Sequence, residues 1–154
     1  MDECSSGLFR HLGTPDAGAR MVIDENFFIN VVLPAGMTHE LTEPEWAQYC
    51  APFARPEDRW PILRWIQQIP IEGEPIDVVD AVLANQQTLL SGPLARLLMV
   101  GEPGAVVGQA EVAWARAHGH DLTIATVGAG THFLPQDCPT AIAGTLRTWL
   151  SLPG

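Results

Sequence analysis

Apolar residues recur at helical spacing through the first part of the chain, up to about residue 92. Phe27, Phe28, Val31 and Val32 lie at positions i, i+1, i+4 and i+5, which is typical of one face of a helix. The prolines of residues 52–75 instead predict a long ordered or semi-ordered connection. The helices predicted here are one capped by Asp24 and ended by Pro34 and Gly36, one opened by the capping box Thr42–Glu45 and stopped at Pro52, and one over 76–90.

From residue 93 onward, short apolar runs alternate with helical patterns. The runs 94–100 and 122–127 are bordered by glycine or proline, and they predict strands, the first of them buried on both faces. Helices are predicted over 107–117 and 139–150, and a turn over 101–104. Strand, helix and strand at this spacing predict a parallel pair joined by a right-handed crossover. The predicted fold class is therefore α/β, a helical region followed by a β-α-β-α unit.

His132 follows the second predicted strand after two glycines, Gly128 and Gly130. A tight turn there can lift an imidazole out of the sheet, and an imidazole can act as a general base near neutral pH. Ligands in parallel sheets bind beyond the carboxyl ends of the strands, so residues 101–106 and 130–133 should face one crevice. The alternative is a core histidine satisfied by a backbone carbonyl. No nucleophile elbow of the Gly-x-Ser type, nor its Asp or Cys form, accompanies the histidine.

Composition excludes several classes of function. The 154 residues suit one domain, and their net charge of −10, with no lysine and scattered arginines, argues against nucleic-acid binding. No apolar stretch reaches the roughly 18 residues that a membrane span requires. The N-terminus lacks the basic and apolar regions of a signal peptide, so we expect a cytoplasmic protein without membrane association.

The sequence predicts no metal site and no cofactor. Three widely spaced cysteines, Cys4, Cys50 and Cys138, fit neither a disulfide framework nor a zinc site. His118 and His120 lack a third ligand at helical or strand spacing, and they are interpreted as a solvated turn.

One set of segments in the first part of the chain (24–34, 41–45, 49–53, 59–61 and 69–75) and one in the second part (101–104 and 130–133, followed by Gln136, Asp137 and Pro139) carry a family resemblance. They resemble haloalkane dehalogenases, which are α/β-hydrolases. The resemblance covers about residues 8–152 and corresponds to the C-terminal half of that family's fold. It implies a helical cap region at 1–92 and the last β-α-β-α part of the hydrolase core at 93–154. The first set of segments is similar to the cap, and the second set is similar to the family's last two strands.

The resemblance implies hydrolysis of carbon–halogen bonds. In the family an aspartate displaces the halide and forms an ester, and a histidine activates the water that cleaves this ester. His132 matches that histidine, and the substrate would be a small apolar halogenated molecule. The positions that match the family's substrate pocket are Phe28, Val32, Ile69, Pro70, Ala105, Val106 and Phe133.

The sequence departs from the family in its catalytic groups. The nucleophilic aspartate, the tryptophan beside it and the halide-binding asparagine would all precede Met1, as would the triad acid of the closest subgroup. Another subgroup places its acid near Gly104, two residues from Glu102. Pro135 and Ile66 also replace the family's usual residues.

Three interpretations follow from these departures. The chain can be a truncated dehalogenase that is inactive alone, a non-enzymatic remnant that at most binds a small apolar molecule, or a relative of the coelenterazine-type luciferases that share this cap and histidine segment. The apolar strand 94–100 would lack a neighbour, and its unpaired edge predicts self-association.

Overall fold

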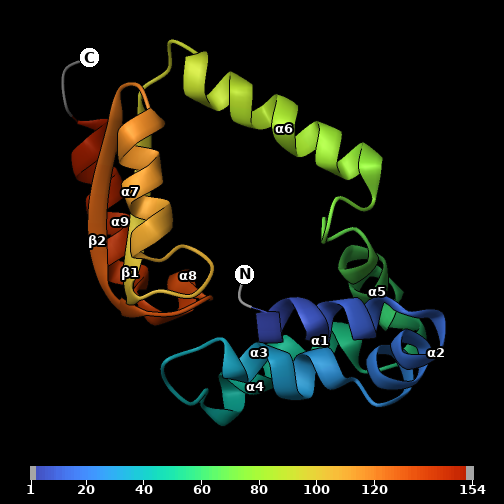
Figure 1. The fold of residues 1–154 in the computed structure, drawn as a ribbon. Helices are drawn as coiled ribbons and strands as arrows, with labels where there is room; N and C mark the ends of the chain where they lie inside the picture. The colour runs from blue at the N-terminus through green and yellow to red at the C-terminus, as the bar shows by residue number, and fades with distance from the viewer. Residues whose placement is uncertain (1–2, 152–154) are drawn as a thin grey trace. The chain divides into compact units, whose positions relative to one another are not determined.

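The computed structural model describes the backbone of residues 3–151 and the side chains from residue 6, and it forms two compact units (Figure 1). One unit consists of the residues up to 35 together with 40–84, and the other consists of 36–39 together with the residues from 85 onward. The short segment 36–39 therefore leaves the first unit and joins the second. The predicted division into a cap region and a hydrolase-core part concerns the family fold and stays a prediction.

The first unit is made of short helices around one apolar core. Buried side chains from separate elements fill that core, among them Leu12, Val22, Ile29, Leu63 and Ile66. Its elements are α1 (Glu3–Gly13), α2 (Pro15–Ala17), η1 (Gly18–Asp24), η2 (Phe28–Val32), α3 (Leu33–Ala35), α4 (Glu43–Cys50), η3 (Ala51–Phe53), η4 (Pro56–Arg59), α5 (Trp60–Gln67) and the first part of α6 (Ile76–Ser91).

The capping box predicted the start of α4 correctly. The backbone N–H and the hydroxyl of Thr42 donate to the Glu45 carboxylate at 2.9 and 2.7 Å. The first of these bonds satisfies an N–H group that a helix start leaves free. The helix predicted from residue 76 is confirmed as α6.

Two predictions for this unit are wrong. Residues 52–75 contain the helix α5, because Pro61 lies in its first turn, where a missing N–H costs nothing. Asp24 ends the π-helix η1 and caps no helix. Asn26 then takes a left-handed conformation (φ 52°), so the next helical segment begins only after it. Pro34 lies inside α3, which ends at Ala35.

The second unit holds two parallel strands, β1 (Arg96–Pro103) and β2 (Leu122–Gly130), with α7 (Gln109–His118) between them in sequence. The helices α8 (Leu134–Asp137) and α9 (Pro139–Leu150) follow, and α9 packs against β2. The predicted α/β class and the parallel pairing are confirmed.

The strands differ from the prediction in extent and burial. Gly101–Pro103, predicted as a turn, continues β1 after a register shift and pairs with Gly128–Gly130. Only Val100 and Gly101 of β1 are buried, and Leu94 lies before it with 75% of its surface exposed, so the strand is not buried on both faces. Across residues 3–151, no helix combines the length and the apolar character that crossing a membrane requires.

Candidate functional site

His132 lies two residues beyond the end of β2. The N–H of Gly104 donates to the carbonyl of Gly130 at 3.0 Å, so the segments after both strands leave the sheet at the same end. The His132 side chain is exposed, and its ring meets the Phe133 ring edge to face at 4.8 Å. The alternative interpretation as a buried core histidine is therefore wrong.

One backbone carbonyl accepts hydrogen bonds from three consecutive residues around His132. The carbonyl of Gly36 accepts hydrogen bonds from the Thr131 hydroxyl at 2.8 Å and from the N–H groups of His132 and Phe133, both at 3.1 Å. Gly36 belongs to the same compact unit as the loop. Three donors on one acceptor fix the path of residues 131–133 while the imidazole stays free.

The carboxylate of Asp137 is a second group that accepts hydrogen bonds from several residues, and its side chain is completely inaccessible to solvent. Its Oδ1 accepts from the N–H and the hydroxyl of Thr38, at 3.0 and 2.8 Å, and lies 3.2 Å from Nδ1 of His39. Its Oδ2 accepts from the N–H of Thr131 at 3.2 Å. Burial by itself would raise the pKa of Asp137, but the hydrogen bonds from Thr38, Thr131 and His39 outweigh it and lower the pKa.

This lowered pKa predicts a loss of stability in acid. The folded protein holds Asp137 ionised more strongly than the unfolded chain does. The stabilisation is thus complete above the ordinary pKa of 3.8 and is lost as the pH falls through the lower folded-state value. Below about pH 4, unfolding free energies from urea titrations should fall more steeply for the wild type than for Asp137→Asn. Parallel pH curves for the two proteins would contradict this assignment.

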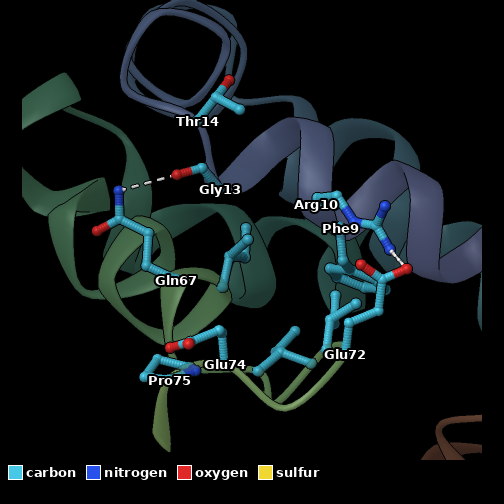
Figure 2. A pocket seen from close by; sticks show the side chains of 11 residues that line it. Phe9, Arg10, Gly13, Thr14, Gln67, Glu72, Glu74 and Pro75 are labelled. Carbon is cyan, nitrogen blue, oxygen red and sulfur yellow. Dashed lines mark hydrogen bonds and ion pairs between the residues drawn. The ribbon is translucent and has the colours of Figure 1, made fainter.

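Four of the predicted pocket residues lie in the first unit. Phe28 packs edge to face on Trp65, with ring centroids 5.7 Å apart, and Val32 is half-buried. Pro70 is exposed. Ile69 lines a cavity of about 450 Å³ between α1, α5 and residues 71–75, and Figure 2 shows this cavity with the Arg10–Glu72 ion pair on its wall.

The other three predicted pocket residues lie in the second unit. Ala105 and Val106 are exposed in the segment after β1, and Val106 has 45% of its surface accessible. Phe133 is half-buried beside Gly36. A separate cavity of about 740 Å³ between β1 and α7 is lined by Glu102 and Arg116 among others, and its lining does not include His132. Among the described residues, no group of three or more His, Cys, Asp or Glu side chains is placed to hold a metal ion.

Comparison with known proteins gives a consistent set of relatives, although no family model matches the chain. A haloalkane dehalogenase of Bradyrhizobium diazoefficiens is 34% identical over 149 residues, which are 97% of this chain and 48% of the relative. A haloalkane dehalogenase of Mesorhizobium japonicum is 33% identical over 143 residues, 93% of this chain and 46% of the relative.

Solved structures agree with the sequence comparison. The putative ancestral haloalkane dehalogenase AncHLD2 superposes with a TM-score of 0.92 at 35% identity, covering 98% of this chain and 53% of that one. The haloalkane dehalogenase DbeA from Bradyrhizobium elkani gives 0.91 at 38% identity, with coverage of 98% and 52%. This chain is a homologue of the haloalkane dehalogenases. It spans about half the length of the curated relatives that it matches.

Sequence reasoning about this dehalogenase homologue missed the residues that hold the His132 loop. Gly36, Thr38 and His39 are 95 to 99 residues away from their partners, and no local pattern connects positions so far apart. Asp137 had a signal, because it lies in a segment that resembles the family. That resemblance gave it no role, and its role emerges from its hydrogen bonds.

Proposed function

We propose that this chain supplies the general base and part of the substrate pocket of a haloalkane dehalogenase. The observation that carries the proposal is an exposed imidazole, His132, on a loop fixed at the end of two parallel strands, in a chain 34% identical to a haloalkane dehalogenase. A carboxylate nucleophile from a segment outside these 154 residues would complete the site.

The chemistry assigns His132 one step. The nucleophilic carboxylate attacks the carbon that bears the halogen, so a C–O bond forms and the halide leaves with the electron pair of the C–halogen bond. His132 then takes a proton from water, whose oxygen attacks the ester carbonyl. The acyl C–O bond breaks, the alcohol leaves with the proton that His132 returns, and the regenerated carboxylic acid loses its proton to solvent. The chain therefore acts in the second half of the reaction, and without the nucleophile there is no ester to cleave.

The substrate in this proposal is a small halogenated alkane, as the names of the relatives indicate. Apolar side chains suit such a molecule because they lose little solvation when it binds. The resemblance to the family assigns the pocket positions to Phe28, Val32, Ile69, Pro70, Ala105, Val106 and Phe133. The exposed side chain of Val106 is available for such a contact.

The same proposal gives the free edge of β1 a partner. Among the described residues the sheet has two strands, so the outer edge of β1 presents unpaired backbone groups. We propose that a strand of the nucleophile-bearing segment pairs there, and that copies of this chain associate through that edge when the segment is absent.

Halide release tests the proposal directly. The chain alone should release no bromide from 1-bromobutane. Co-expression with the segment of the Bradyrhizobium diazoefficiens relative that this chain does not match should restore release. His132→Ala should lower the restored rate by a factor of about 10² to 10⁴, the usual contribution of a general base.

His120→Ala is the matched control, because His120 is an exposed histidine in the turn before β2. It should retain the restored rate. A complex that is folded by circular dichroism and size-exclusion chromatography yet releases no halide would overturn the proposal in favour of a non-enzymatic binding role.

A further inference from the structure

The carboxylate of Asp137 joins two segments that are far apart in sequence. Its Oδ1 serves Thr38 and His39, and its Oδ2 serves Thr131. An ionised carboxylate is suited to this position because both of its oxygens act only as acceptors. The side chain is inaccessible to solvent in the folded chain, so its oxygens are satisfied by these protein donors.

Thr131 connects Asp137 to the loop 131–133, which carries His132. The N–H of Thr131 binds Asp137, and its hydroxyl binds the carbonyl of Gly36. That carbonyl also accepts the N–H of His132, the next residue. Asp137 and Gly36 therefore connect the same two segments, residues 36–39 and the loop 131–133. Asp137 binds the N–H of Thr131, and the Gly36 carbonyl binds its hydroxyl.

We propose that Asp137 is a positioning residue for His132: by clamping residues 36–39 to the loop 131–133, it fixes the backbone from which the imidazole is presented. The inference rests on the proposed function for the role of the imidazole. The clamp itself is a property of this chain, and it predicts coupling between Asp137 and two amides that Asp137 does not touch, those of His132 and Phe133.

Asp137→Asn tests the coupling because an amide has one acceptor oxygen. Whichever way it faces, its NH₂ group meets either the N–H of Thr131 or the donors of Thr38. Hydrogen exchange followed by NMR on the 154-residue chain should show faster exchange at Thr38 or Thr131, and at His132 and Phe133 as well. The expected increase at His132 and Phe133 is about 10- to 100-fold, as for the loss of a hydrogen bond to a charged group.

Asp121→Asn is the matched control. Asp121 is an exposed aspartate of the same unit, and its left-handed backbone (φ 49°) accepts asparagine readily. It should leave the exchange of His132 and Phe133 unchanged. If Asp137→Asn fails to fold, two milder variants of Thr38 replace it. Thr38→Val removes one hydroxyl and should accelerate exchange at His132 about fivefold. Thr38→Ser keeps the hydroxyl and should leave exchange at His132 as slow as in the wild type.

A readout on the ring separates positioning from general loosening. Three-bond couplings that report the χ1 angle of His132 should show rotamer averaging in Asp137→Asn, while those of His118 and His120 stay as in the wild type. Unchanged exchange at His132 and Phe133 in a folded variant would overturn the proposal, and so would equal changes at all three histidines. Neither measurement uses halide release, so a failure of the proposed function would be seen separately.

Discussion

Replacing Arg59 with methionine should lower the free energy of unfolding of the first unit by about 3 kcal/mol or more. Arg59 is only 8% exposed. Its guanidinium donates to the carbonyl of Ile23 at 2.6 Å and to those of Phe53 and Ala54 at 2.8 and 2.9 Å. Methionine fills the volume of the aliphatic stem but removes the donor from the buried contact to Ile23 and from the part-buried contacts to Phe53 and Ala54. A loss of this size is a large part of the total stability of a typical domain.

Hydrogen exchange of the α5 amides measures this loss within the first unit. Arg55→Met is the matched control, because Arg55 is an exposed arginine whose Nε donates to the Asp58 carboxylate at 2.9 Å. Exposed ion pairs contribute little to stability, so exchange in this variant should stay close to that of the wild type. Equal effects of the two substitutions would show that the carbonyl contacts of Arg59 do not stabilise the unit.

The sequence predicted those elements whose signals are local. The capping box at Thr42 carries its own hydrogen-bond partners and marks the start of α4. Pro139 and Leu150 bound α9 as predicted, because the apolar spacing between them is helical. The apolar runs joined by a helical pattern predicted β1 and β2 as parallel strands, since a crossover of that length permits little else.

Elements that depend on tertiary context were missed. Proline density hid α5, although Pro61 occupies a position where a helix tolerates it. The glycines at 101 and 130 indicated turns, yet they continue the strands because Leu134 packs where a Cβ on either would lie. Glycine in a strand marks this kind of close approach, and only the three-dimensional neighbour distinguishes it from a turn.

The candidate site likewise has one part that follows from local sequence and another that depends on residues far apart in the chain. The exposed position of His132 beyond β2 could be predicted, because the strand, the glycines and the histidine follow one another in the sequence. The clamp could not, since Gly36 and Asp137 act through partners near the opposite end of the chain. The resemblance to the family marked the segment that contains Asp137, but only the hydrogen bonds of Asp137 show which residues it contacts.

Gly36→Ala should displace the His132 loop by steric contact. A Cβ at position 36 would lie 2.7 and 2.8 Å from two ring carbons of Phe133 and 3.3 Å from the Cβ of His132. The two distances to the ring are too short, so we expect Phe133 to shift and to move the loop away from the carbonyl that binds its N–H groups. We expect the second unit to lose about 1 to 3 kcal/mol, the usual cost of overpacking. Exchange at His132 and Phe133 should increase more than exchange in β2.

Gly144→Ala provides the opposite result in the same unit. Gly144 lies inside α9, and a Cβ there would have no atom within 4 Å. Alanine is favoured over glycine in a helix by up to about 1 kcal/mol, so this variant should unfold at a slightly higher urea concentration. Urea titrations of both variants, with exchange at His132 and β2 as local reporters, test the contact. If Gly36→Ala is as stable as the wild type and keeps slow exchange at His132, then Phe133 can move aside without cost. The close packing of Gly36 against the loop then does not hold the histidine in place.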